Sequence, residues 1–198
     1  MSAEAASQAL GYPTAAAPVR RPRRHDPDRR ERLITAALDV IAEHGIAGAT
    51  HRAIARAADV PLGSTSYHFS SIDELLAAAF TVLAERVAGA LEERMRAAPD
   101  PVAAVDSLAR HLADDLLGDE RALVLAVELY VAAARRPALR AVTQDWMLRS
   151  RQALEVHFDA VTARELDALV EGLVLHQFLS TDPMTSEQVR HALLRITR

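Results

Sequence analysis

Apolar residues recur at helical spacing along most of this chain, and no segment shows the sustained alternation of apolar and polar positions typical of strands. Prolines, glycines and polar clusters divide the pattern into segments. The expected helices cover residues 27–45, 51–58, 62–68, 72–98, 101–117, 120–134, 137–161, 164–180 and 186–196. The sequence therefore predicts an all-α fold of about nine helices.

The first expected helix has clear signals at both ends. Asp26 is suited to cap its free N–H groups, and Pro27 would occupy the first position, where a missing N–H costs nothing. Gly45 is placed to end the helix in the left-handed conformation. Its apolar stripe would bury against the two short helices that follow.

Residues 50–69, THRAIARAADVPLGSTSYHF, predict two short helices joined by a tight turn. Thr50 would cap the first helix, which ends before Pro61 because a residue that precedes proline avoids the helical region. The second helix is short and rich in hydroxyl groups. Such a pair suits a helix-turn-helix, whose second helix enters the major groove of DNA. An ordinary pair of helices with one solvated face is the alternative.

A long helix is expected directly after this unit. Ser71 and Glu74 have the spacing of a capping box, and an apolar run follows them. A helix over residues 72–98 is about 40 Å long at 1.5 Å per residue, enough to connect the first unit to a second domain. Residues 120–134 are apolar nearly all round, so this helix should lie at the centre of that second domain.

Composition narrows the class of protein. The 198 residues include no cysteine, which excludes disulfides, thiolate chemistry and cysteine-ligated metals. No apolar run reaches the roughly 18 residues needed to span a bilayer, and the N-terminus has no signal-peptide core, so we expect no membrane contact and a cytoplasmic location. Residues 1–70 hold 9 arginines against 7 acidic residues, whereas residues 71–198 hold 14 against 20. A basic first part supports binding to a polyanion.

The first 25 residues are expected to form a disordered arm that ends in a basic cluster. This segment is rich in alanine, serine and proline, and the cluster contains Arg23 and Arg24. Basic arms of this kind follow a DNA backbone or enter a minor groove. A solvated, solubilising tail is the alternative.

Enzymatic activity is not expected. The sequence has no Gly-x-Ser-x-Gly elbow, no phosphate-binding glycine loop and no His-Glu-x-x-His motif. His111 and Asp114 lie one turn apart without an evident third ligand. We therefore expect no catalytic residues, no metal and no cofactor.

Residues 33–76, LITAALDVIAEHGIAGATHRAIARAADVPLGSTSYHFSSIDELL, resemble the TetR (tetracycline-repressor) family of transcription factors. The shared pattern is an apolar helix that ends in glycine, a threonine that opens the second helix, Ile-Ala within it, and a Tyr-x-His-Phe-like closure before an acidic Leu-Leu start. The resemblance implies a helix-turn-helix domain over residues 26–70. It also implies a helical effector-binding and dimerisation domain over residues 71–198.

The resemblance assigns DNA-binding roles to particular residues. Thr50 and Arg52 would contact phosphates. Tyr67 and His68 would lie against the DNA backbone, and Phe69 would pack inward; a core position for Tyr67 and a helix-ending role for His68 are the alternatives. The residues expected to face the groove and read bases are Leu62, Gly63, Ser64 and Thr65.

Three positions depart from the family pattern. Ser66 stands where the family often has a second ring, and Ile72 lies near a common lysine. Both changes remove contacts to the DNA backbone, for which the arginine arm would compensate. Asp59 replaces the glycine that commonly follows the second helix.

The last two expected helices resemble the dimerisation pair of the family. The residues expected at a homodimer interface are Leu166, Leu169, Val170, Gly172, Leu173 and Phe178. A dimer would read two half-sites of a pseudo-palindromic operator about one turn of DNA, or a multiple, apart. Burial of these residues within one chain is the alternative.

The body should hold a mostly apolar effector pocket with a few polar groups. The candidate ligand-binding residues are polar side chains in apolar stretches, namely His111, Glu128, Tyr130, Trp146, Arg151 and His176. Glu128 needs either a partner inside the protein or a cationic or hydroxylated ligand, because an unpaired buried carboxylate is costly. Each histidine is more often a core or surface residue than a ligand contact.

These expectations combine into a DNA-binding repressor whose operator binding is relieved by an unknown small-molecule effector. The effector would shift the fourth helix and so change the spacing of the two recognition helices in the dimer. A helical ligand-binding or adaptor protein without DNA binding is the alternative, but it leaves the pattern of residues 50–69 unexplained.

Overall fold

The computed structural model describes residues 28–198. The basic arm with Arg23 and Arg24, and the expected cap at Asp26, lie outside these residues. The helices of the described part are α1 (Arg29–Gly48), α2 (His51–Ala57), α3 (Gly63–His68), α4 (Ile72–Ala97), α5 (Pro101–Arg110), the π-helical turn η1 (His111–Leu116), α6 (Glu120–Ala133), α7 (Pro137–Leu154), α8 (Ala160–Leu179) and α9 (Ser186–Ile196). The prediction of an all-α fold is confirmed.

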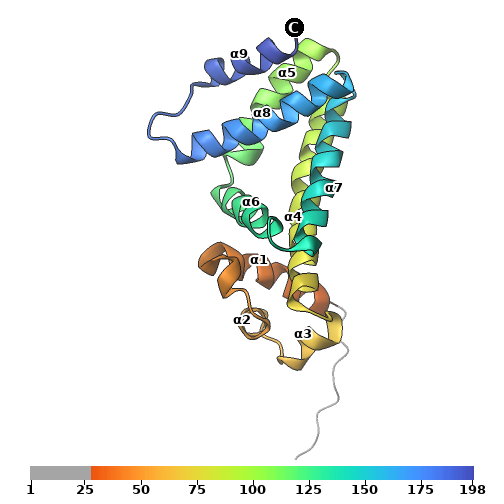
Figure 1. The fold of residues 1–198 in the computed structure, drawn as a ribbon, viewed down its shortest axis with the longest axis vertical. Coiled ribbons are helices and arrows are strands. Elements are labelled where there is room, and N and C mark those ends of the chain that lie inside the picture. Colours follow the sequence, from red (N-terminus) through yellow and green to blue (C-terminus); the bar gives the residue numbers. More distant parts are fainter. Residues whose placement is uncertain (1–27) are drawn as a thin grey trace, which may run out of the picture.

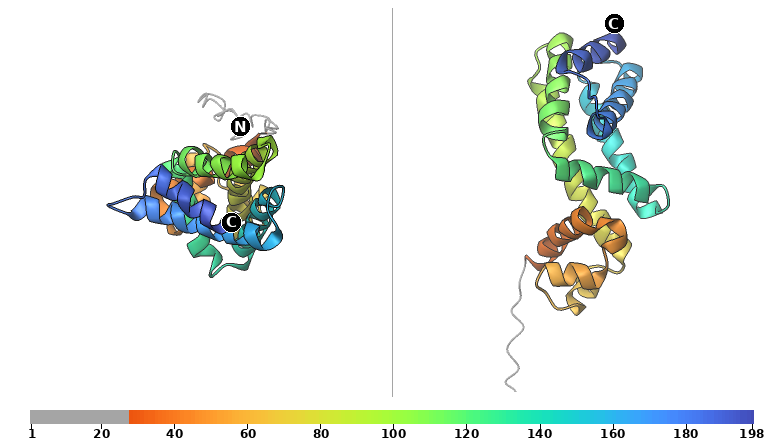
Figure 2. Two further views of the ribbon diagram at one scale, coloured as in Figure 1. Left: turned by 90° about the horizontal axis from the view of Figure 1, so that it is seen from above. Right: turned by 90° about the vertical axis from the view of Figure 1, so that its left-hand side faces the viewer.

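The helices form a small lobe and a larger body (Figure 1). Helices α1, α2 and α3 make up the lobe, which we call the head. Helices α4 and α7 lie side by side and rise from the head, α6 lies between the head and α8, and α9 lies beside α5 and α8 at the far end (Figures 1 and 2). None of the helices described in residues 28–198 combines the length and apolar character needed to cross a membrane.

Two hydrophobic clusters hold these helices together. One cluster joins the head to the nearer part of the body, because Leu33 and Ile41 of α1 share it with Phe80 of α4 and Leu129 of α6. The other cluster lies in the far part of the body, with Leu108 of α5 among its members. Packing therefore crosses residue 70, and α4 and α6 are both in contact with the head.

Most helix boundaries agree with the expected ones to within three residues. The segment expected as one helix over residues 101–117 is divided into α5 and the π-helical turn η1, and a second large difference lies between α7 and α8. One helix was expected over residues 137–161, but α7 ends at Leu154 and α8 already begins at Ala160. Asp159 caps α8, since its Oδ1 accepts from the N–H groups of Val161 at 2.9 Å and Thr162 at 3.1 Å. This carboxylate satisfies two free N–H groups and so fixes the start of the helix there.

The capping box expected at the start of α4 forms only in part. Ser71 Oγ accepts from the N–H of Glu74 at 3.1 Å, as expected. Glu74 Oε2 turns instead to Ser70, whose N–H and hydroxyl both donate to it at 2.6 Å. These hydrogen bonds from Ser70 hold the pKa of Glu74 below its ordinary value.

Candidate functional site

The turn between α2 and α3 is held by backbone hydrogen bonds and one unusual residue. Val60 N–H donates to Ala55 O at 3.0 Å, which closes the end of α2. Asp59 has φ 51°, in the left-handed region. Aspartate adopts this region more readily than most side chains do, which explains how it replaces the common glycine. The helix-turn-helix geometry is thus retained despite the departure.

Helix α3 presents a different face from the one expected. Ser64 and Thr65 are only 8% and 1% exposed, and Thr65 Oγ1 donates to Leu62 O at 2.7 Å. The expectation that these two side chains read bases is therefore wrong, because they face the core of the head. With only six residues in α3, sequence periodicity could not assign its faces.

The exposed face of α3 is formed by Leu62, Gly63, Ser66 and Tyr67. Leu62 is 47% exposed and Tyr67 is 84% exposed. The alternative of a core position for Tyr67 is therefore wrong. Ser66, not expected to contact DNA, shares this face. Hydroxyl, phenol and apolar groups thus project together, as a helix that contacts base edges and thymine methyl groups requires.

Helix α2, which contacts α3, carries two arginines. Arg52 and Arg56 are both exposed. Thr50 caps α2, since its Oγ1 accepts from the N–H of Ala53 at 3.1 Å, and its own O–H can still donate to a phosphate. Phe69 packs inward as expected, with the guanidinium of Arg30 5.2 Å from its ring centre. His68 is half-buried and meets Tyr67 edge-on, at 4.9 Å between ring centres.

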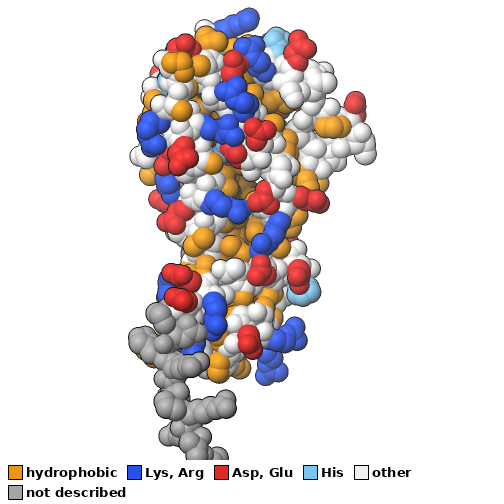
Figure 3. Space-filling view, turned by 180° about the vertical axis from the view of Figure 1, so that it is seen from behind, with side chains coloured by type: hydrophobic (Ala, Val, Ile, Leu, Met, Phe, Trp, Pro, Cys, Tyr) orange, Lys and Arg blue, Asp and Glu red, His pale blue; other side chains and the backbone are white. Residues whose placement is uncertain are grey.

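Charge on the rest of the molecule is mixed. On the face seen in Figure 3, acidic and basic side chains alternate over the body with apolar patches between them. Several ion pairs join charged side chains of the body, for example Arg190 with Asp106 and Arg149 with Glu92. The body therefore offers no broad basic surface on this face to compete with the head for DNA.

The body contains a largely apolar cavity of about 340 Å³, which we call the main cavity. It lies between helices, the usual position for a small-molecule site in a helical protein. Its lining residues are Val87, Asp115, Leu116, Ala122, Leu123, Ala126, Val127, Tyr130, Trp146, Met147, Glu171, Gly172, Val174 and Leu175.

Glu171 is the carboxylate of the main cavity without a cationic partner among the described residues. The Tyr130 hydroxyl donates to its Oε1 at 2.7 Å. Burial, together with the negative charge of Asp167 one turn away, raises the pKa of Glu171 above its ordinary value although the Tyr130 hydrogen bond opposes this. Burial also raises the pKa of Tyr130, so its phenol remains protonated and donates. The ionised carboxylate is therefore costly until a cation approaches.

The neighbouring carboxylates have cationic partners within the protein. Arg94 forms a bidentate ion pair with Asp115, in which Nε donates to Oδ2 at 2.6 Å and Nη2 donates to Oδ1 at 3.0 Å. This ion pair lowers the pKa of Asp115. Buried His111 donates from Nδ1 to the same carboxylate at 2.8 Å. Arg151 Nε donates to Asp167 Oδ2 at 2.9 Å. Because Asp115 and Asp167 already have these partners, a cationic ligand would gain more interaction free energy from Glu171 than from either of them.

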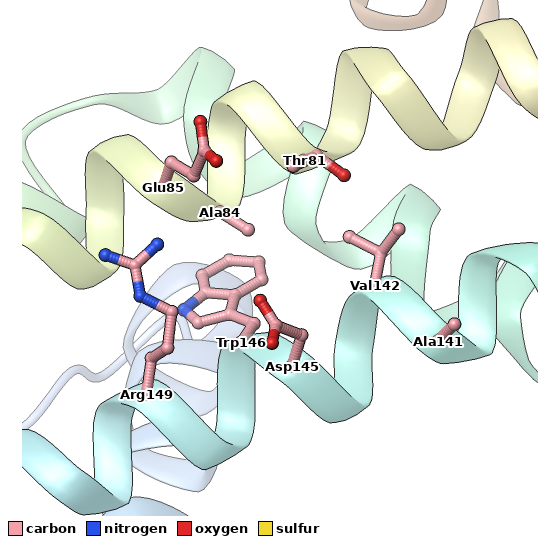
Figure 4. A pocket seen from close by; sticks show the side chains of 8 residues that line it. All are labelled: Thr81, Ala84, Glu85, Ala141, Val142, Asp145, Trp146 and Arg149. Atoms are coloured by element: carbon pink, nitrogen blue, oxygen red, sulfur yellow. The ribbon is translucent and has the colours of Figure 1, made fainter.

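Aromatic rings adjoin this carboxylate. Tyr130 and Trp146 lie nearly parallel, 16° apart, with 6.1 Å between their ring centres. Trp146 also lines a second hollow of about 230 Å³ between α4 and α7, where its indole lies beside Asp145 and below Ala84 (Figure 4). Ring faces near a carboxylate favour a flat, positively charged ligand.

The structure separates the six expected ligand-binding residues into three groups. Tyr130 and Trp146 line the main cavity. His111 lines a small adjoining hollow. Arg151 does not line that hollow, but it forms an ion pair with Asp167, which does. Glu128 and His176 line none of these cavities; His176 is exposed, and Glu128 Oε2 accepts from the N–H of Ile46 in the head at 2.9 Å. Glu128 thus has a partner inside the protein, a backbone amide rather than an arginine.

Sequence reasoning missed Glu171. It occurs in LVEGLVL, the same kind of signal that singled out Glu128, namely one acid in an apolar run. The whole segment was assigned to the dimer interface, which hid the residue. Its meeting with Tyr130, 41 positions earlier, is a tertiary contact that the sequence does not display.

The expected interface residues divide between core and surface. Leu166, Val170 and Leu173 are buried within their own chain, so they cannot form the interface as expected. Leu169 and Phe178 are half-buried, and Gly172 is exposed. The exposed stripe of α8 contains instead Val161, Ala168, Gly172, Leu175 and Leu179, at helical spacing.

Comparison with known proteins agrees with this arrangement. Residues 33–79 match the family model "Bacterial regulatory proteins, tetR family", and residues 99–198 match "Tetracyclin repressor-like, C-terminal domain". The chain is 33% identical over 184 residues to the HTH-type transcriptional regulator CymR of Pseudomonas putida, covering 84% of this chain and 88% of CymR.

Two solved structures are similar over most of their length. The regulator SCO7518 of Streptomyces coelicolor A3(2) superposes with a TM-score of 0.83 at 47% identity, over 86% of this chain and 99% of that chain. The multidrug binding protein EbrR complexed with ethidium superposes with a TM-score of 0.77 at 43% identity, over 87% and 99%. EbrR has also been solved with proflavin and with malachite green.

Proposed function

This chain belongs to the TetR family of DNA-binding transcriptional regulators, and on this premise we propose that it is a repressor released from operator DNA by an aromatic cation bound in the main cavity. The single observation that carries the choice of effector is Glu171, a partly buried carboxylate at the main cavity with no cationic partner among residues 28–198. As a regulator of transcription the protein acts on DNA, in the cytoplasm.

DNA binding is assigned to the exposed face of α3 and its flanks. Leu62, Gly63, Ser66 and Tyr67 face the groove, while Thr50 and Arg52 contact phosphates. Arg23 and Arg24 add salt-dependent contacts from the arm. The protein acts as a homodimer on a pseudo-palindromic operator, with the exposed stripe of α8 at the interface.

Binding to DNA is tested with fragments from upstream of the protein's own gene, by fluorescence anisotropy at low salt. We expect one fragment to bind tightly and the affinity to fall steeply with added salt. A folded dimer that binds no fragment would overturn the assignment and favour the alternative of a helical ligand-binding protein.

Support for a cationic effector comes from charge, shape and similarity. Glu171 supplies the negative charge, and Tyr130 and Trp146 supply ring faces. Ethidium, proflavin and malachite green, found in the similar EbrR structures, are all aromatic cations. A neutral ligand would leave the ionised carboxylate unpaired, which costs binding free energy.

The effector assignment is tested by ethidium binding without DNA. Trp146 is the single tryptophan of the chain, so quenching of its fluorescence reports ligand at the hollows that it lines, and a substitution of Glu171 tests whether the ligand occupies the main cavity. Glu171→Gln keeps an acceptor for the Tyr130 hydroxyl but removes the charge, and we expect ethidium affinity to fall about tenfold or more, roughly 1.4 kcal/mol. Glu93→Gln, an exposed site on α4, is the matched control. Equal affinity in both variants would contradict the proposal.

Release from DNA is tested with tetraphenylphosphonium, an aromatic cation that does not intercalate. We expect it to lower operator affinity of the wild-type protein and of Glu93→Gln. Glu171→Gln should stay bound to DNA at the same concentration, which excludes a direct effect of the cation on DNA.

A further inference from the structure

Helix α6 lies between the head and α8 (Figure 1), with residues that line the main cavity and residues that pack against the head. On the cavity side, Val127 and Tyr130 line the main cavity. On the opposite side, Leu125 and Leu129 pack in the hydrophobic cluster that contains Leu33 of α1. A ligand that displaces α6 therefore also displaces atoms in contact with the head.

Glu128 is the polar contact between α6 and α1 that reaches the backbone of the head. Its Oε2 accepts from Ile46 N–H at 2.9 Å, across 82 positions of sequence. Gly45 makes this approach possible, since its φ is +65° and a Cβ there would lie 3.2 Å from Glu128 Oε1. The left-handed conformation thus favours glycine at this position, and a Cβ would in addition crowd the Glu128 carboxylate.

The amide that Glu128 holds is at the start of a separate turn. The left-handed Gly45 breaks α1, so residues 46–48 form a short last turn whose free N–H is capped by a carboxylate from another helix. Ala49 N–H donates to Ile46 O, and Thr50 N–H donates to Gly48 O at 3.0 Å. Thr50 is the cap of α2, so four residues connect the Glu128 contact to the DNA-binding face.

A second polar contact between α6 and α1 is an exposed ion pair, which contributes less to stability. Arg121 of α6 pairs with Asp39 of α1, but both side chains are about half exposed. Exposed ion pairs contribute little and are screened by salt. The Glu128 hydrogen bond is less exposed and directional. Its donor is the backbone N–H of Ile46, which, unlike the Arg121 guanidinium, has no side-chain rotamer through which it could move away.

We propose that Glu128 is the positioning residue that couples the main cavity to the DNA-binding head, by holding the last turn of α1 in the ligand-free, DNA-binding arrangement. This inference rests on the proposed function for the identity of the effector. Ligand in the main cavity moves α6 and withdraws the carboxylate from Ile46, which loosens the turn that leads into α2. The contact therefore stabilises the DNA-binding state over the effector-bound state, so it affects the affinities for operator DNA and for the effector in opposite directions.

Glu128→Ala tests the coupling with two binding measurements. Loss of the contact disfavours the DNA-binding state, so operator affinity should fall about three- to tenfold while ethidium affinity in the absence of DNA rises by a similar factor. Glu128→Gln keeps an acceptor for Ile46 N–H and should stay close to wild type. Glu120→Gln, exposed on the same helix, is the matched control.

The outcomes separate coupling from simple damage to the head. Lower operator affinity with unchanged ethidium affinity would overturn the proposal and leave Glu128 as a local cap of α1. Unchanged values for both ligands would overturn it as well.

Hydrogen exchange gives a readout that needs no effector. In Glu128→Ala the amides of residues 46–53 should exchange faster than in Glu128→Gln, and operator DNA should protect α6 in the wild-type protein but not in Glu128→Ala. Equal exchange in the three proteins would overturn the coupling role. If the wild-type protein does not bind ethidium, the assigned effector class is wrong, and these exchange data still decide the role of Glu128.

Discussion

At the scale of single residues, the backbone at Asp59 stores strain that a glycine would release. Its φ of 51° lies in a region that disfavours side chains. We expect Asp59→Gly to raise the free energy of unfolding by about 0.5 to 1 kcal/mol, the usual gain where the native conformation suits glycine. Urea denaturation measures this, and an unchanged or lower midpoint would contradict it.

Glu171 should make ethidium binding depend on pH. Its pKa is raised by burial, so at low pH the carboxyl is neutral and attracts a cation weakly. Affinity should rise as pH increases from the ordinary glutamate pKa of about 4.3 through the raised value, and then level off. Glu171→Gln should show a flat profile over the same range. A wild-type profile that is also flat would contradict the role of the carboxylate.

The same raised pKa has the opposite effect on stability. Ionisation of Glu171 costs more in the folded than in the unfolded state, so its contribution to stability decreases as pH rises between those two pKa values. A carboxylate suited to a cationic ligand thus weakens the ligand-free fold once it is ionised, which is typical of functional groups.

At the scale of elements, the stability of a helix should depend on the residue that caps its first turn. Ser71→Ala removes the hydroxyl that accepts from Glu74 N–H and should lower the free energy of unfolding by about 1 kcal/mol. Gln152→Ala, at an exposed position in the last turn of α7, should change stability little. Equal effects of the two substitutions in thermal unfolding would contradict the assignment of Ser71 as a cap.

The two faces of α3 should respond differently to substitution. Ser66→Ala changes an exposed side chain and should alter preference among operator variants without loss of stability. Thr65→Val removes the donor to Leu62 O from a buried site and should lower stability by about 1 kcal/mol with sequence preference retained. A binding-site selection experiment with both variants decides whether the exposed face is the one that reads bases.

At the scale of the whole molecule, dimer formation should depend on the exposed stripe of α8. Ala168 is exposed and lines none of the cavities described above, so Ala168→Glu should leave the single chain folded. In a symmetric dimer, a charge on this stripe meets the matching surface of the partner. We expect monomers in sedimentation and a loss of operator affinity of at least tenfold. Ala138→Glu, exposed at the start of α7, should remain dimeric.

The sequence by itself determined the number of helices, most of their ends and the position of the DNA-binding unit. These features depend on local physics, since a cap such as Thr50 or a breaker such as Gly45 acts within one turn. The pattern of residues 33–76 likewise sufficed to identify the family, because its spacing lies within one short segment.

Only the tertiary structure decided which side chains face inward and which distant residues meet. Six residues of α3 carry too little periodicity to distinguish its core face from its exposed face, so Ser64 and Thr65 were misplaced and Ser66 was overlooked. Glu128 and Glu171 look alike in sequence, each an acid in an apolar run. Packing sets their roles, because one meets a backbone amide of the head and the other a tyrosine at the main cavity.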